Sequence, residues 1–266
     1  MVMTTDIDRL EFASNTARKA GALALKYFSD LGSLTVKSKG VQDMATEADV
    51  NTETIIRDAI SQAYPDDAFL GEESSDSFAV TDAPGTWVVD PIDGTQPFIF
   101  GMQTWCISIA YYSHGKVELG VVYDPCNDEM FAAGRGQGTT LNGRPIHVAD
   151  VSSVSEGLVS VGYSTRVTPE DTLGPLGRLL RADGMYHRNG SGALSLAYVA
   201  AGRLIGYFEP HMCAWDVAAG ELLVREAGGR SNDCLPNDQA LIDGSLVIAA
   251  AAGVYDELQA IVDGKS

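Results

Sequence analysis

The chain has 266 residues, of which 45% are hydrophobic and 20% charged, a composition typical of one large globular domain or two closely packed ones. Its formal net charge of −18 disfavours nucleic acid and anionic lipid as partners. No apolar run is long enough for a membrane helix, and Met1 to Asp8 lack the pattern of a secretory signal, so we expect a cytoplasmic protein.

The same charge bears on any phosphorylated ligand. A protein that binds phosphate needs local positive charge, and this chain has only 18 Lys and Arg. Bound metal ions are the obvious source of that charge.

Two helices are predicted in the first 65 residues. Apolar and small residues recur at helical spacing over 6–28 and over 47–63, where Pro65 ends the pattern. Short apolar runs that are typical of strands then follow. They cover 87–89, 105–112, 116–123 and 128–133, with a tight turn at Asn142-Gly143. The first half therefore predicts helices packed on an antiparallel sheet.

From about residue 155 helices and strands alternate. Predicted strands cover 157–162, 204–208, 229–231 and 245–250, and predicted helices cover 169–182, 191–201, 215–227 and 254–263. Alternation of this kind indicates a layered α/β arrangement. We place the domain boundary near residue 150, which gives an N-terminal α+β domain (1–150) and a C-terminal α/β domain (151–266) that completes the site.

The most informative segment follows the buried strand Trp87-Val88-Val89. It reads Asp90-Pro91-Ile92-Asp93-Gly94-Thr95, and we expect Pro91 to stop the strand ladder. Two carboxylates on one rigid turn repel each other, and a divalent cation with hard oxygen ligands, Mg²⁺ or Mn²⁺, removes that conflict. Taken alone, however, two aspartates three residues apart are also typical of an ordinary turn.

Two further acids add weight. Glu72 follows the apolar run Ala68-Phe69-Leu70, where a solvated loop charge is the alternative reading. Asp216 begins a predicted helix, where an N-terminal cap is the alternative. Asp49, in Thr46-x-x-Asp49, likewise resembles a capping box.

Together these segments resemble the inositol monophosphatase family of magnesium-dependent, lithium-sensitive phosphatases. The matching segments, in chain order, are Asp43-Met44-Ala45-Thr46-Glu47-Ala48-Asp49, Gly71-Glu72-Glu73-Ser74, Asp90-Pro91-Ile92-Asp93-Gly94-Thr95 and Trp215-Asp216-Val217-Ala218-Ala219-Gly220. The resemblance runs from about residue 10 to residue 260. It implies a layered αβαβα sugar-phosphatase-like fold, two to three Mg²⁺ ions per site, and a homodimer.

The resemblance also implies roles for single residues. Glu72, Asp90 and the Ile92 carbonyl would hold one metal, and Asp90, Asp93 and Asp216 a second. A third, weaker metal would involve Glu72 and, more loosely, Asp49. Thr95, paired with Asp49, would orient and deprotonate the attacking water, while the amides of Gly94 and Thr95 would hold the phosphate.

On the substrate side, Arg188-Asn189-Gly190-Ser191-Gly192 resembles the glycine-serine motif that the family places before a helix. Gly190, Ser191 and Gly192 would face substrate hydroxyls, and Glu209, with Asp216, would bind the alcohol part. Gln96-Pro97 departs from the family, which often has Thr-Asn there, and proline removes a backbone donor. Gly192 likewise replaces the more usual alanine. Both departures concern the alcohol part of the substrate.

Other patterns carry no chemistry. Gly134-Arg135-Gly136-Gln137-Gly138 is followed by a hairpin signal instead of a helix, which excludes a dinucleotide-binding loop. The four histidines show no metal-ligand spacing. Cys106, Cys126, Cys213 and Cys234 lack CxxC spacing, so we expect free thiols.

These observations predict a Mg²⁺-dependent phosphomonoesterase for a small polyol phosphate, with inositol 1-phosphate as first choice. Histidinol phosphate and a 3′-phosphorylated nucleotide are alternative substrates. A regulatory binding protein with the same fold is the alternative from another class, although the predicted metal ligands are all present.

Overall fold

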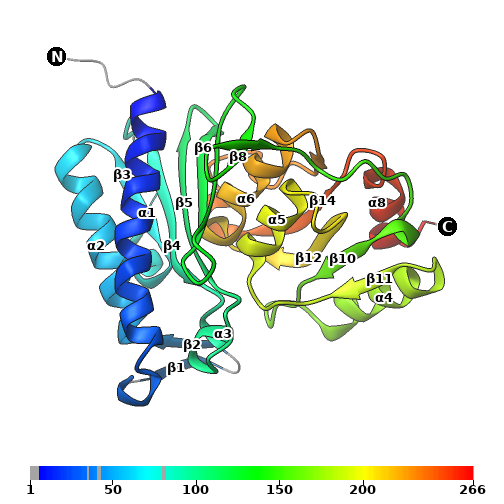
Figure 1. Ribbon diagram of the computed structural model, residues 1–266, viewed down its shortest axis with the longest axis horizontal. Coiled ribbons are helices and arrows are strands. Elements are labelled where there is room, and N and C mark those ends of the chain that lie inside the picture. Colours follow the sequence, from blue (N-terminus) through cyan, green and yellow to red (C-terminus); the bar gives the residue numbers. More distant parts are fainter. Residues whose placement is uncertain (1–5, 35, 41–42, 80–81, 266) are drawn as a thin grey trace.

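Helices and sheets alternate in five layers (Figure 1) in the computed structural model, which describes residues 6–34, 36–40, 43–79 and 82–265. The outer helices α1 (Asp6–Phe28) and α2 (Glu47–Ala63) cover one face of a seven-stranded sheet. Helices α5 (Gly192–Ala200) and α6 (Ala214–Glu226) lie between that sheet and a five-stranded one. Helices α4 (Pro169–Arg181) and α8 (Tyr255–Asp263) form the last layer. The layered αβαβα fold is confirmed.

The large sheet keeps chain order. Its strands are β3 (Ala68–Gly71), β4 (Thr86–Asp93), β5 (Cys106–Ser113), β6 (Lys116–Asp124), β7 (Glu129–Gly134), β8 (Thr139–Leu141) and β9 (Arg144–Ile146). All neighbours are antiparallel except β3 and β4, which are parallel with Gly71 opposite Val89. Because parallel strands end at the same edge, the residues after β3 lie beside the end of β4.

The small sheet has the order β11-β10-β12-β14-β13. Its strands are β10 (Leu158–Val161), β11 (Met185–His187), β12 (Gly206–Met212), β13 (Arg230–Ser231) and β14 (Ser245–Ala250). Strand β10 is parallel to β11 and β12, whereas β14 is antiparallel to β12 and β13. The predicted alternation in the second half is therefore correct.

Apolar burial explains the outer helices. Ala13, Ala17, Ala20 and Ala24 of α1 are fully buried at helical spacing against the sheet. Helix α2 begins at the Thr46 capping box that the sequence indicates. Short elements without a clear period were missed, namely β1 (Val36–Gly40), β2 (Asp43–Thr46), α3 (Thr95–Ile99), β11 (Met185–His187), α7 (Ala240–Asp243) and the 3₁₀ turns Leu31–Ser33, Glu72–Ser77 and Val154–Glu156.

One expectation about β4 was wrong. Pro91 does not end the ladder, because pairing with β5 continues from Asp90 opposite Ser108 to Asp93 opposite Cys106. Three residues of β4 thus advance against two of β5. Strand β4 accommodates Pro91 as a β-bulge, a feature common beside active sites.

Several smaller expectations are resolved. The glycine-rich segment forms the turn between β7 and β8, where the Glu226 carboxylate accepts hydrogen bonds from the amides of Gly136 (2.9 Å) and Gly138 (3.0 Å). All four cysteines are free thiols. No helix of the described residues is long and apolar enough to cross a membrane. The first five residues of the predicted non-signal N-terminus lie outside the described ones, and the boundary near residue 150 stays a prediction.

Candidate metal centre and active site

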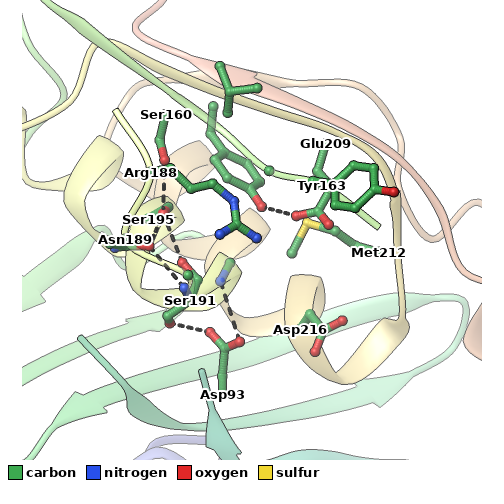
Figure 2. Close-up of a pocket in the computed structure, with 15 residues that line it drawn as sticks. Asp93, Ser160, Tyr163, Arg188, Asn189, Ser191, Ser195, Glu209, Met212 and Asp216 are labelled. Atoms are coloured by element: carbon green, nitrogen blue, oxygen red, sulfur yellow. Dashed lines mark hydrogen bonds between the residues drawn. The ribbon is translucent and has the colours of Figure 1, made fainter. Parts of the chain in front are cut away.

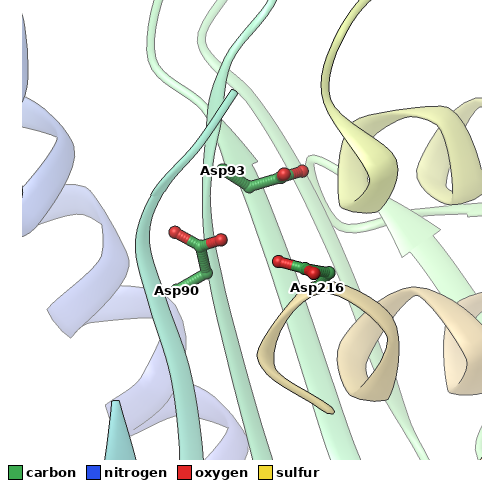
Figure 3. Close-up of side chains that lie close together, drawn as sticks. All are labelled: Asp90, Asp93 and Asp216. Carbon is green, nitrogen blue, oxygen red and sulfur yellow. The ribbon is translucent and has the colours of Figure 1, made fainter. Parts of the chain in front are cut away.

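Three aspartates, two buried and one partly buried, converge where β4 ends (Figure 3). One carboxylate oxygen each from Asp90, Asp93 and Asp216 lies within 4.8 Å of the others. Asp90 and Asp93 are only 2% and 7% exposed. Within the described ranges, no lysine or arginine forms an ion pair with any of the three. The cluster thus concentrates negative charge without a counterion from the protein.

The pKa values show the consequence. Burial, followed by the charges of Glu72, Asp93 and Asp216, raises the pKa of Asp90 well above its usual range. Burial and the charge of Asp93 raise the pKa of Asp216 to about 7. Burial also raises the pKa of Asp93, although hydrogen-bond donors at Ser191 and Ala193 oppose the rise. A divalent cation would relieve this repulsion, and an all-oxygen ligand set fits Mg²⁺ or Mn²⁺.

The backbone fixes the two aspartates of β4. In the bulge, the Ile92 amide donates to Asp90 Oδ1 at 2.9 Å. Gly94 has φ +97°, and a Cβ there would lie 2.9 Å from the Thr104 carbonyl oxygen, so only glycine fits this turn. The predicted turn is therefore observed, with helix α3 directly after it.

Asp93 connects the two halves of the chain. Its carboxylate accepts hydrogen bonds from the Ser191 hydroxyl and, at 2.7 Å, from the Ala193 amide at the start of α5. Asp216 occupies the third position of α6 and accepts from the Cys213 amide at 3.1 Å. The interpretation of Asp216 as a helix cap is thus correct as well, and the carboxylate that caps the helix also belongs to the cluster.

Glu72 lies next to this cluster but outside the group of three. It is the first residue of the 3₁₀ turn after β3, and the parallel pairing of β3 with β4 brings its charge close to Asp90. The buried Glu53 of α2 accepts a hydrogen bond from the Glu73 amide at 2.8 Å and so holds that turn. Glu53 was missed, although its position four residues after Asp49 on one helix face was a usable signal.

Thr95 and Asp49 are brought together as expected. The Thr95 hydroxyl lies 3.3 Å from Asp49 Oδ1 and 3.3 Å from the Ile92 carbonyl oxygen, and it can donate a hydrogen bond to either. Asp49 also accepts from the Thr46 amide at 2.7 Å, so the capping box exists too. Burial raises the pKa of Asp49 to about 6.

A cavity of about 620 Å³ opens beside the aspartates. Its lining includes Glu72, Gly94, Thr95, Gly190, Glu209 and Asp216. A smaller chamber of about 130 Å³ adjoins it and is lined by Ser191 and Gly192 (Figure 2). Burial raises the pKa of Glu209 to about 7, even though the Tyr207 hydroxyl donates to its carboxylate. The predicted substrate residues therefore share one connected space, while their roles stay predictions.

The departures from the family pattern now have a structural setting. Pro97 lies in the first turn of α3, where its missing amide breaks no helical hydrogen bond. Its ring packs against Gly190, since a Cβ on Gly190 would come within 2.7 Å of Pro97 Cγ. A Cβ on Gly192 would come within 2.5 Å of Met212 Cε, so Met212 fills the space of the usual alanine methyl.

Sequence reasoning assigned no role to several other cavity residues. The main ones are Tyr163, Arg166, Arg188 and Asn189. Two arginines near a substrate motif in a strongly acidic chain were the available signal.

The layered fold and a carboxylate cluster that could hold a metal ion are the features that the family resemblance implies. The sequence model of the inositol monophosphatase family matches residues 7–263. The chain belongs to this family.

Named relatives and solved structures agree with that assignment. The Nus factor SuhB of Escherichia coli (strain K12) is 37% identical over 258 residues, covering 94% of this chain and 96% of the relative. The inositol-1-monophosphatase of Rhizobium meliloti (strain 1021) is 38% identical over 231 residues, 86% of each protein. The crystal structure of extragenic suppressor protein suhB from Bartonella henselae is similar to this one with a TM-score of 0.87 and 34% sequence identity. The match covers 95% of this chain and 97% of that chain. An IMPase from Thermotoga maritima has TM-score 0.84 and 32% identity, with 97% and 98% covered.

Proposed function

We propose that this protein is a Mg²⁺-dependent phosphomonoesterase acting on a small polyol phosphate, with inositol 1-phosphate as first choice. The observation that carries the proposal is the cluster of the buried Asp90 and Asp93 with the partly buried Asp216, beside the Thr95–Asp49 pair. Glu72, Asp90 and the Ile92 carbonyl would hold one Mg²⁺, and Asp90, Asp93 and Asp216 a second. A third, weaker ion would involve Glu72 and Asp49, and Mn²⁺ suits the same ligands.

The chain's own residues would do the rest of the chemistry. Bound cations supply charge stabilisation for the transferring phosphoryl group and acidity for water. The Thr95 hydroxyl, donating to Asp49, would orient the attacking water and pass its proton toward the Asp49 carboxylate. The amides of Gly94 and Thr95 would donate to the phosphate, and Glu209 would accept from hydroxyls of the alcohol. The reaction needs no covalent enzyme intermediate.

A substrate panel tests this proposal. Phosphate release is measured with Mg²⁺ on inositol 1-phosphate, histidinol phosphate and a 3′-phosphorylated nucleotide. Highest kcat/KM on inositol 1-phosphate supports the first choice, whereas turnover of histidinol phosphate without turnover of inositol 1-phosphate overturns it. The unusual Gln96-Pro97 at the cavity is the reason to include both alternatives.

A regulatory binding role is the second candidate, favoured by the name Nus factor SuhB of a relative at 37% identity. Asp93→Ala separates the two, because it removes a predicted metal ligand without altering the outer surface. A biological role that survives this substitution would assign function to binding.

Three family-typical properties also belong to the proposal: inhibition by lithium, a homodimer and a cytoplasmic location. Inhibition of phosphate release by LiCl but not by NaCl, and sedimentation at twice the chain mass, are the expected results.

A further inference from the structure

Two arginines in the cavity stand apart from most others in this acidic chain. Among the described residues, most arginine side chains bind a carboxylate or a backbone carbonyl. These are Arg9, Arg18, Arg57, Arg135, Arg178, Arg203, Arg225 and Arg230. The guanidinium groups of Arg166 and Arg188 have no such partner in the same part of the chain, and both line the larger cavity.

The two arginines extend into the larger cavity from separate loops of the C-terminal half. Arg166 lies between β10 and α4, and Arg188 lies between β11 and α5. Figure 2 shows the Arg188 side chain extending into the space between Glu209 and Ser191. Both positive charges act on Glu209, so the three side chains share one electrostatic environment. Thr95 and Asp216 line the same cavity.

This arrangement exceeds what a neutral alcohol requires. The transferred phosphate would be served by cations at the aspartate cluster and by backbone amides. Hydroxyl groups of a neutral polyol need only ordinary acceptors and donors, such as Glu209. An unpaired guanidinium presents a planar set of N–H donors that matches phosphate and carboxylate oxygens. Two such groups in a chain of net charge −18 therefore indicate a second anion on the ligand.

We infer that Arg166 and Arg188 form a second anion subsite, which binds a phosphate or carboxylate on the leaving-group part of the substrate. The favoured substrates are then phosphate esters that carry a further anionic group. This inference rests on the proposed function for the location of the transferred phosphate.

Three esters of one sugar test the subsite. Glucose 1-phosphate has a neutral leaving group, glucose 1,6-bisphosphate adds a phosphate, and glucuronic acid 1-phosphate adds a carboxylate. Hydrolysis at position 1 is measured with Mg²⁺ for the wild type, Arg166→Gln, Arg188→Gln and the double variant. Arg144→Gln is the matched control, because Arg144 is exposed on β9 and lines neither cavity.

The double variant should lower kcat/KM about tenfold or more for at least one doubly anionic ester, because each charged hydrogen bond contributes roughly that factor. The effect on glucose 1-phosphate should stay below about twofold. Loss confined to the bisphosphate or to the glucuronic acid ester identifies which anion the subsite binds. An equal loss on all three esters, or no loss on any, overturns the inference.

Calorimetry separates this inference from the proposed function. Glucose 1,6-bisphosphate is titrated in the presence of Mg²⁺ into Asp90→Asn and into Asp90→Asn/Arg166→Gln/Arg188→Gln, where Asp90→Asn suppresses turnover. If the wild type hydrolyses no ester but binding weakens about tenfold without the arginines, the subsite stands and the phosphatase proposal fails. If inositol 1-phosphate is hydrolysed and the affinity for the bisphosphate is the same with and without the two arginines, the phosphatase proposal stands and the subsite fails.

Discussion

The aspartate cluster beside the cavity and the arginine pair that lines it are built differently. In the proposed metal centre Asp90, Asp93 and Asp216 each accept a hydrogen bond from a backbone amide, and the first two are almost fully buried. At the proposed anion subsite Arg166 and Arg188 are exposed loop residues, and within the described chain their guanidinium groups form no ion pair or hydrogen bond. The proposed metal ligands are thus tied to the backbone of the fold, whereas the proposed anion subsite consists of loop side chains that can change without disturbing it.

The largest expected effect comes from Asp90→Asn. Loss of a shared metal ligand should reduce kcat/KM about 10³-fold or more, since metal ions contribute several kcal/mol to such reactions. In EDTA at pH 8 the same substitution should raise Tm by about 2–4 °C, because it removes one of the repelling buried charges. Phosphate release and thermal unfolding measure the two effects. A lower Tm in EDTA would contradict the electrostatic account of the cluster.

Glu53→Ala should act through the turn that carries Glu72. Without the acceptor for the Glu73 amide, Mg²⁺ affinity should fall about tenfold, as found for residues that support metal ligands. Turnover at saturating Mg²⁺ should change much less. Calorimetric titration with Mg²⁺ and the Mg²⁺ dependence of kcat provide the readouts.

Glu53→Gln is the control, because its amide oxygen still accepts from Glu73. It should restore most of the Mg²⁺ affinity. Equal weakening in both variants would mean that the charge of Glu53, instead of its hydrogen bond, is what the site requires.

Metal-free protein should lose stability as pH rises. The pKa of Asp216 is raised from 3.8 to about 7 and that of Asp49 to about 6, so the folded state holds protons that the unfolded state releases. This contribution is complete below about pH 4 and is lost as pH rises through 6 to 7. Tm in EDTA should therefore fall between pH 5 and 8, and added Mg²⁺ should raise Tm more at pH 8 than at pH 5. A Tm gain from Mg²⁺ that is larger at pH 5 would refute this linkage.

Pro97→Ala should have the smallest effect. Pro97 adds rigidity to the first turn of α3 and packs on Gly190 at the cavity. Its replacement should therefore lower the free energy of unfolding by about 1 kcal/mol. The KM for the phosphate ester should change more than kcat, because Pro97 is expected to contact the alcohol part of that ester. A fall in kcat with KM unchanged would place Pro97 on the phosphate side instead.

Features with a strong local pattern were predictable. The buried alanines of α1, the Thr46 capping box and the convergence of Asp90, Asp93 and Asp216 all appear in the structure as expected. The bulge at Pro91 was not, because it depends on pairing with β5, which lies outside the motif. Helix α3 is too short to show a period. Arg166 and Arg188 became candidates only after folding brought their separate loops to one cavity.

The hydrogen bonds between Asp93 and the start of α5 join two parts of the chain that could be expressed as separate fragments. The aspartates of β4 come before the segment that joins β9 to β10, and Asp216 comes after it. Fragments separated in that segment, around residues 147–157, would each hold only part of the ligand set. Under the proposed phosphatase function, phosphate release from two co-expressed fragments would report their reassembly, because neither fragment holds the complete set of proposed metal ligands.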